Sequence, residues 1–203
     1  MNLGVSERRF VASSFKLVVI GVSAGGLHAV GTILRRLPAD FPVPIVVVQH
    51  RAKESTALAS VLQEFSGLRV CEIEDKMPIE AGRVYIAPPD YHVLVEDGHL
   101  ALSVDAPVTY SRPSIDVLFD SAADQLGEGV IGVVLTGANH DGAAGLRSIV
   151  RRGGRAIVQS PESAEMSVMP RAALNAVPQA IVVPLSEVAA RLTKLVSAGR
   201  TAV

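Results

Sequence analysis

From residue 16 onwards, short runs of apolar residues alternate with segments whose apolar positions recur at helical spacing. The runs consist mainly of valine, isoleucine and leucine, which is typical of strands buried on both faces of a parallel sheet. They predict strands at residues 16–21, 44–49, 69–73, 84–87, 129–137, 155–159 and 180–185. The amphipathic segments predict helices at residues 26–37, 55–65, 142–152, 170–176 and 186–198.

Residues 92–104 depart from this alternation of strands and helices. Two β-prone runs, 92–95 and 99–104, flank the sequence Glu96-Asp97-Gly98. Asp-Gly favours the positive φ angles of a type I′ turn, so this segment is predicted to form a β-hairpin. A further helix is predicted from Ser114, as its N-cap, to about Leu126, because the serine hydroxyl can accept a hydrogen bond from an amide of the first turn.

The order of these elements predicts an α/β fold in a single domain. Strands that alternate with helices form βαβ units with right-handed crossovers, and these build a mostly parallel sheet between two helical layers. We therefore expect a three-layer α/β/α, doubly wound architecture with an antiparallel hairpin insertion. Residues 1–15 are expected to form a flexible tail, and residues 16–203 the domain itself.

Composition limits the classes of function. Hydrophobic residues make up 49% of the 203 positions and charged residues 19%, as in a well-buried globular protein. The net charge of −1, with no long run of one sign, argues against nucleic-acid binding. The first 15 residues lack the apolar run of a signal peptide, and no apolar stretch reaches about 18 residues, so we expect neither a signal peptide nor membrane insertion. A single cysteine, Cys71, excludes an intrachain disulfide, which fits a reducing compartment, and we predict a cytoplasmic protein. Because Cys71 falls in a short strand-like run, we expect its side chain in the core.

Three polar residues follow three of the predicted apolar strands. Ser23 follows the first strand, His50 follows the second, and Asp141 follows the strand at 129–137. Because the carboxyl ends of parallel strands share one edge of the sheet, these side chains are expected to lie near one another. Serine, histidine and aspartate are the nucleophile, base and orienting acid of a catalytic triad, so this edge is the candidate site of a serine hydrolase acting on a carboxylic ester.

The residues around Ser23 support its role as the nucleophile. Gly21-Val22-Ser23-Ala24-Gly25 fits the pattern Gly-x-Ser-x-Gly, in which small residues allow a sharp turn from strand to helix. The backbone amide of Ala24 would then lie at a helix N-terminus, where it can stabilise an oxyanion. The chain order serine, histidine, aspartate differs from the order serine, acid, histidine of α/β-hydrolases, which argues against that fold.

Other interpretations of these residues remain open. Gly21–Gly26 also resembles a dinucleotide-binding loop with its middle glycine replaced, although Gln49-His50-Arg51 stand where such a fold has an acidic residue. Ser23 alone fits a helix N-cap. Asp90 and Asp116 are weaker candidates for the acid. The five histidines lack carboxylates at ligand spacing, so neither a metal nor a cofactor is expected.

Six stretches in order resemble the catalytic domain of the chemotaxis protein-glutamate methylesterases, the CheB family. These stretches are VVIGVSAGG, LPADFPVPIVVVQH, AGRVYIAPPDYHVLV, RPSIDVLFDSAA, GVVLTGANHDGAAGL and VMPRAAL. The resemblance implies hydrolysis of γ-glutamyl methyl esters on the cytoplasmic helices of chemoreceptors, with release of methanol, and in many members deamidation of receptor glutamines. It places the triad on Ser23, His50 and Asp141. The oxyanion hole would be formed by the amides of Ala24 and Ala138.

The chain departs from the family pattern at two places. Ala24 stands where the family usually has threonine, and Ala138 and Asn139 replace a methionine and a glycine in the usual TGMGNDG. An oxyanion hole formed by backbone amides does not depend on these side chains, so it can persist with Ala24 and Ala138. About 15 residues precede the first predicted strand, too few for the receiver domain that the family commonly carries, so none is expected in this chain. The altered residues before Asp141 motivate an alternative, a non-catalytic chemosensory module that binds partner proteins.

Overall fold

The computed structural model describes residues 14–51 and 57–198. Seven of its strands form one parallel sheet, in the order β10-β9-β8-β1-β2-β5-β3. Their bounds are β1 Leu17–Val22, β2 Ile45–Gln49, β3 Arg69–Glu72, β5 Arg83–Ile86, β8 Val130–Val134, β9 Arg155–Gln159 and β10 Ile181–Val183. The predicted flexible tail lies mainly outside the described residues, and Phe15, which lies within them, packs against the core.

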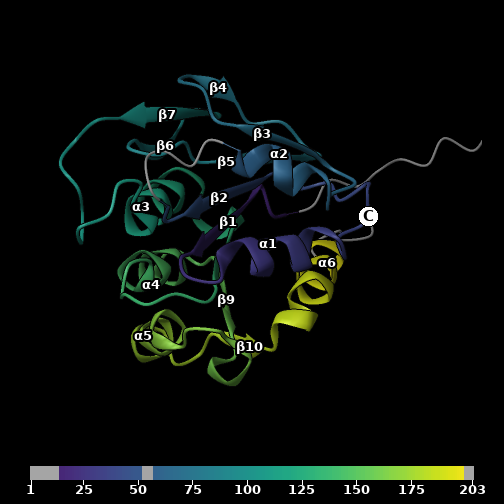
Figure 1. The fold of residues 1–203 in the computed structure, drawn as a ribbon, viewed down its shortest axis with the longest axis vertical. Coiled ribbons are helices and arrows are strands. Elements are labelled where there is room, and N and C mark those ends of the chain that lie inside the picture. The colour runs from purple at the N-terminus through teal and green to yellow at the C-terminus, as the bar shows by residue number, and fades with distance from the viewer. Residues whose placement is uncertain (1–13, 52–56, 199–203) are drawn as a thin grey trace, which may run out of the picture.

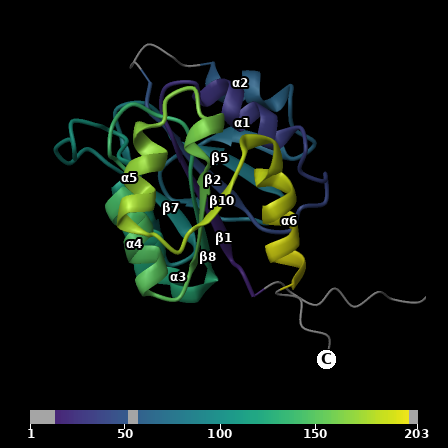
Figure 2. The same ribbon diagram turned by 90° about the horizontal axis from the view of Figure 1, so that it is seen from below.

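Helices cover both faces of this sheet, as Figures 1 and 2 show. One face packs against α1 (Gly26–Leu34), α2 (Leu58–Gln63) and α6 (Val188–Ala198). The other packs against α3 (Ile115–Leu126), α4 (Ala143–Arg151) and α5 (Val168–Ala176). Short 3₁₀ turns occupy Gly127–Gly129, Pro161–Ser163 and Leu185–Glu187. The prediction of a three-layer α/β/α fold with a mostly parallel sheet is confirmed.

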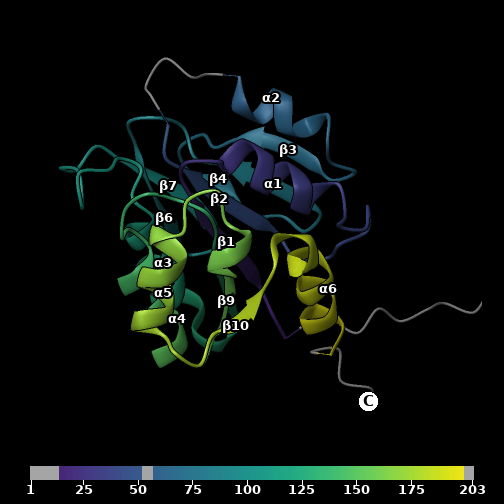
Figure 3. The same cartoon turned by 60° about the horizontal axis from the view of Figure 1, so that its bottom comes forward.

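The core explains why the apolar runs became strands. All six residues of β1 are buried, and alternate side chains point to opposite faces of the sheet. Val18 and Ile20 join the cluster under α1 and α6, whereas Leu17 and Val19 join the cluster under α3 and α4. Figure 3 shows α1 and α6 on their side of the sheet. A strand with two buried faces therefore needs apolar residues at every position.

A small antiparallel sheet is added at one end of the molecule (Figure 1). Its strands are β4 (Met77–Pro78), β6 (His92–Glu96) and β7 (His99–Ser103), in the order β4-β7-β6. Asp97 and Gly98 both have positive φ, at 40° and 83°, so the predicted hairpin turn is confirmed. The third strand, β4, was not predicted, because two residues carry no periodic signal.

Several element ends differ from the prediction. The helix predicted at 26–37 ends at Leu34, and α5 begins at Val168, two residues earlier than expected. The predicted helix 55–65 begins partly outside the described residues. The predicted strand 129–137 ends at Val134, because the chain then turns over the edge of the sheet. There the Gly137 amide donates to the carbonyl of Met166, at 3.0 Å.

No helix in the described ranges is long and apolar enough to cross a membrane.

The sheet has a topological switch point beside β1. The strand β1 pairs with β2 on one side and with β8 on the other. From β1 the chain therefore winds towards one edge through β2 and later towards the other through β8 and β9. Such a switch opens a crevice beyond the carboxyl ends of the strands, which is where α/β proteins bind ligands.

Candidate active site

Three loops meet at this crevice. The amide of Ser23, the first residue after β1, donates to the carbonyl of Thr136 in the loop after β8, at 3.0 Å. The amide of His50, the first residue after β2, donates to the carbonyl of Val22, also at 3.0 Å. These two bonds extend the ladders of the sheet by one step, and so they set the positions of Ser23 and His50 relative to each other.

The glycines around Ser23 have the physical role expected of them. A Cβ atom on Gly21 would lie 2.3 Å from Cγ2 of Ile115, so only glycine allows α3 to approach the strand end. Gly25 has a φ of 77°, in the left-handed region that side chains rarely adopt, and it precedes the first residue of α1. Gly25 therefore allows the sharp turn after Ser23, and Gly21 allows the close packing of α3 against the end of β1.

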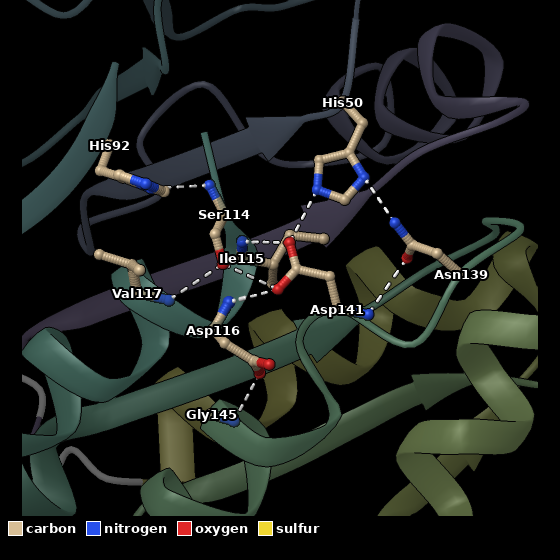
Figure 4. A network of polar contacts seen from close by, with 9 residues as sticks. All are labelled: His50, His92, Ser114, Ile115, Asp116, Val117, Asn139, Asp141 and Gly145. Atoms are coloured by element: carbon tan, nitrogen blue, oxygen red, sulfur yellow. Dashed lines mark hydrogen bonds and ion pairs between the residues drawn. The ribbon is translucent and has the colours of Figure 1, made fainter. Parts of the chain in front are cut away.

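His50 and Asp141 are in direct contact, as Figure 4 shows. His50 Nε2 lies 2.8 Å from Asp141 Oδ2. The Asp141 side chain is fully buried, whereas the His50 side chain keeps 13% of its surface exposed. The carboxylate can only accept, so the imidazole donates through Nε2–H, which leaves a lone pair on Nδ1.

The N-terminus of α3 supplies the other partners of Asp141 (Figure 4). The Ser114 hydroxyl donates to Oδ1 at 2.9 Å, and so does the amide of Asp116, at 2.9 Å. The amide of Ile115 donates to Oδ2 at 2.7 Å. With His50, four donors therefore surround a buried carboxylate, which offers about four lone-pair positions. The acid is fixed in one orientation and fully satisfied.

These contacts set the charge state of Asp141. Burial raises the pKa of its carboxyl, but the hydrogen bond from His50 and those from the amides of Asp116 and Ile115 outweigh burial, so the pKa lies below its ordinary value. Asp141 is therefore ionised near neutral pH, as a group that orients an imidazole must be.

The lowered pKa of Asp141 predicts a pH dependence of stability. Because the folded protein holds this carboxyl in its charged form more strongly than the unfolded chain does, its contribution is complete above about pH 5 and is lost as the pH falls through the folded-state pKa. We expect the urea unfolding free energy to fall less steeply from about pH 5 to pH 3 in Asp141→Asn than in the wild type. Equal slopes would show that Asp141 makes no such contribution.

The structure leaves the Ser23 hydroxyl without a hydrogen bond to any described residue. It lies beside the loop that follows β8, since a Cβ atom on Gly137 would be 2.9 Å from the Ser23 Cβ. Within the same described part of the chain, the amides of Ala24 and Ala138 donate to no protein acceptor. Both residues are exposed, and amides without a protein acceptor are the kind of donor that an oxyanion hole needs.

A fourth side chain, not foreseen at this site, contacts the imidazole. Asn139 Nδ2 lies 3.2 Å from His50 Nδ1, on the side of the ring opposite Asp141. The Asn139 side-chain oxygen accepts a hydrogen bond from the amide of Asp141, at 3.1 Å. The only signal for it in the sequence is the replacement of the family's glycine at this position.

Neither of the weaker acid candidates, Asp90 and Asp116, forms a hydrogen bond or an ion pair with the imidazole. Asp90 pairs with Arg112, with 2.7 Å between Oδ1 and Nη2. The Asp116 carboxylate accepts from the amide of Gly145 at 2.7 Å, and burial followed by the nearby Asp141 charge raises its pKa. Neither carboxylate contacts His50.

His92 supports the residue that begins α3, a role that the spacing of residues in the sequence does not indicate. Its buried ring accepts a hydrogen bond from the amide of Ser114 at Nδ1, 3.1 Å away, and its Nε2 donates to the carbonyl of Ala106 at 3.2 Å. The ring therefore joins the start of α3 to the loop before it. The predicted N-cap is confirmed, since the Ser114 hydroxyl also accepts from the amide of Val117, at 3.5 Å.

Ser114→Ala is expected to lower the stability of the protein. The change removes a helix N-cap and a donor to the buried Asp141, so we expect a loss of about 1–2 kcal/mol in the free energy of unfolding. Urea unfolding measures this loss, with the exposed Ser197→Ala as the matched control. If the two variants were equally stable, Ser114 would have no supporting role.

Two hollows flank the site. One, of about 490 Å³, is lined by His50, Arg51, Tyr110 and Arg112 among others. The other, of about 290 Å³, is lined by Gly25, Glu162 and Glu165 among others. A Cβ atom on Gly25 would lie only 2.5 Å from Glu165 Oε2, so a carboxylate lies against the glycine loop. A negative charge there disfavours a pyrophosphate, which counts against the dinucleotide interpretation.

Comparison with known proteins points to one family. The CheB methylesterase family profile matches residues 18–192. A Leptospira interrogans protein, named for protein-glutamate methylesterase/protein-glutamine glutaminase activity, is 44% identical over 90% of this chain and 95% of its own length. An Anaeromyxobacter dehalogenans protein of the same named activity is 43% identical over 95% of this chain and 58% of its own length. The crystal structure of the Thermotoga maritima CheB methylesterase catalytic domain is similar with a TM-score of 0.85 and 34% identity, covering 90% of this chain and 99% of that one.

Proposed function

Because this chain belongs to the CheB methylesterase family, we propose that it is a serine hydrolase that demethylates glutamate γ-methyl esters on chemoreceptors. The observation that carries this proposal is the hydrogen bond of 2.8 Å between His50 and the buried Asp141, beside the turn that holds Ser23. An imidazole fixed by an ionised carboxylate, next to a serine on a sharp turn, is suited to acyl transfer.

The reaction we propose has two halves. In the first, Ser23 Oγ attacks the ester carbonyl carbon while its proton passes to His50 Nδ1. The amides of Ala24 and Ala138 stabilise the oxyanion, and collapse of the tetrahedral intermediate transfers the proton from His50 to the departing methanol. In the second half, His50 takes a proton from water, which attacks the acyl-serine. Collapse of the second tetrahedral intermediate returns this proton from His50 to Ser23 Oγ, and the glutamic acid side chain that is released loses its own proton to water to become the carboxylate.

The same site suits a second leaving group. If the substrate is a glutamine side chain, the proton from His50 goes to the departing amine, and ammonia replaces methanol in an otherwise equal sequence of steps. The names of the related proteins include protein-glutamine glutaminase, which supports this extension to deamidation.

A protein substrate fits the surroundings of His50. The hollow of about 490 Å³ beside the imidazole is bordered by Tyr110, a fully exposed side chain. The loop that carries Tyr110 is held by Arg112, which donates to the carbonyls of Val104 and Asp105 at 2.8 and 3.0 Å. A preorganised loop with an exposed aromatic residue is suited to contact a helix of a partner protein. We propose the methylated cytoplasmic helices of chemoreceptors as that partner and the cytoplasm as the location.

Two observations favour a second candidate, a non-catalytic chemosensory module. The Ser23 hydroxyl makes no hydrogen bond with any described residue, and Asn139 contacts the imidazole nitrogen that the mechanism needs. A chain that only binds receptors would tolerate this arrangement.

Methanol release distinguishes the two functions. The intact chain is mixed with methylated receptor cytoplasmic fragments, and methanol and receptor binding are measured on the same samples. The esterase proposal predicts methanol in proportion to the methyl groups lost from the receptor. Binding without methanol would contradict the esterase proposal and support the module.

A further inference from the structure

His50 Nδ1 is already occupied in the resting structure. Asn139 Nδ2 lies 3.2 Å from it, while Nε2 on the other side of the ring contacts Asp141 at 2.8 Å. A neutral imidazole offers one lone pair, in the plane of the ring, and can accept one well-aligned hydrogen bond. The proposed function requires this same lone pair to accept the Ser23 proton. Asn139 and Ser23 therefore compete for one acceptor.

The backbone fixes the direction in which the Asn139 amide points. The amide of Asp141 donates to the Asn139 side-chain oxygen, at 3.1 Å. A peptide N–H can only donate, so the oxygen of the asparagine must face it, and the NH₂ group must face the imidazole. Asn139 thus presents a donor to Nδ1, in the same way that Asp141 presents an acceptor to Nε2. Both sides of the ring select one tautomer, with the proton on Nε2.

Asn139 lies in a partly exposed segment. Its side chain is half-buried, and its neighbours Ala138 and His140 are both exposed. The segment lies between β8 and α4, above the crevice where a substrate would enter.

We propose that Asn139 is a positioning residue that holds His50 in a resting state, with the correct tautomer but with its basic nitrogen covered. This proposal rests on the proposed function. In the free protein the Asn139 amide occupies His50 Nδ1 and the Ser23 hydroxyl is left unactivated. Entry of a substrate moves the Asn139 amide away, and the Ser23 hydroxyl then donates to the released lone pair. The chain thereby couples activation of its nucleophile to occupancy of the site.

Two substitutions at position 139 test this proposal because they are expected to act in opposite directions. Asn139→Ala removes the competing donor, so Ser23 should react faster with a small fluorophosphonate that needs no receptor contacts, by about threefold to tenfold. Asn139→Asp keeps an oxygen for the Asp141 amide but replaces the donor by a carboxylate. This carboxylate stabilises a proton on Nδ1, so labelling should be slower than in the wild type.

A magnetic resonance measurement on the unsubstituted chain provides an independent readout. With ¹⁵N labelling, a scalar coupling across the N–H···N hydrogen bond is expected between Asn139 Nδ2 and His50 Nδ1. It should disappear when Ser23 is phosphonylated. This measurement remains informative if Asn139→Ala fails to fold.

The outcomes separate this proposal from the one on which it rests. If Ser23 is labelled in the wild type but both variants react more slowly, Asn139 is only a structural support and the resting-state proposal is wrong. A coupling that is absent in the free protein overturns it as well. If Ser23 is labelled in none of the three proteins, the esterase proposal itself fails, and the role of Asn139 fails with it.

Discussion

Asp141→Asn is expected to lower kcat for methyl ester hydrolysis by about 10⁴-fold, the loss that the same change causes in a serine protease triad. The carboxylate accepts the Nε2–H of His50, and this fixes the tautomer in which Nδ1 is basic. If the asparagine turns its NH₂ towards the ring, Nε2 must become the acceptor and the proton moves to Nδ1. His50 can then no longer take the proton of Ser23.

The other partners of Asp141 make the substitution unfavourable in either orientation. Its Oδ2 also accepts from the amide of Ile115, and its Oδ1 accepts from the amide of Asp116. An NH₂ group at either position would face a backbone donor, which costs about 1–3 kcal/mol of stability for a buried group. We expect lower stability together with the lost rate, measured by urea unfolding and by kcat.

A control on α3, the helix whose N-terminus donates to Asp141, separates the two effects of Asp141→Asn. Asp120→Asn makes the same chemical change at an exposed position of α3. It should leave kcat within about threefold of the wild-type value, as surface substitutions usually change little. If Asp141→Asn kept most of the wild-type kcat, the assignment of Asp141 as the orienting acid would be wrong.

Much of the fold could be predicted because buried parallel strands leave a strong pattern. The strands β1, β2 and β8 are almost wholly buried and almost wholly apolar, so each stands out as a run of valine and isoleucine. The hairpin could be predicted from Asp97-Gly98, since few other pairs adopt two positive φ angles. The ends of the helices and the strand β4 could not be predicted from the sequence, because they depend on tertiary packing.

The topology of the sheet explains why the closeness of the three site residues could be predicted. Ser23, His50 and Asp141 follow strands of one parallel sheet, so they must share its carboxyl edge. The contact between His50 and Asp141 is observed. The roles of these residues in catalysis stay predictions, as does the oxyanion hole at Ala24 and Ala138.

The supporting contacts could not be read from the spacing of residues. Ser114 was recognised only as a helix cap, whereas its hydroxyl also donates to Asp141. The contact between Asn139 and His50 depends on the path of a loop that no periodicity describes. Side chains that contact and orient the site residues are brought there by tertiary packing. A single sequence indicates such a side chain only where the residue is unusual for its family.

Ser23→Ala is expected to reduce methanol release by about 10³-fold or more, because no other group can form the acyl intermediate. The substitution removes one hydroxyl that makes no hydrogen bond in the described part of the protein, so it should leave folding and receptor binding unchanged. The substitution should therefore change the rate of ester hydrolysis alone.

The most direct test compares wild-type protein with Ser23→Ala on the same methylated receptor fragments, at equal concentrations and with binding verified for both. The account predicts methanol from the wild type, none above background from Ser23→Ala, and equal binding by the two proteins. Equal methanol release by both proteins, or none by either, would contradict the claim that this chain is an esterase with Ser23 as its nucleophile.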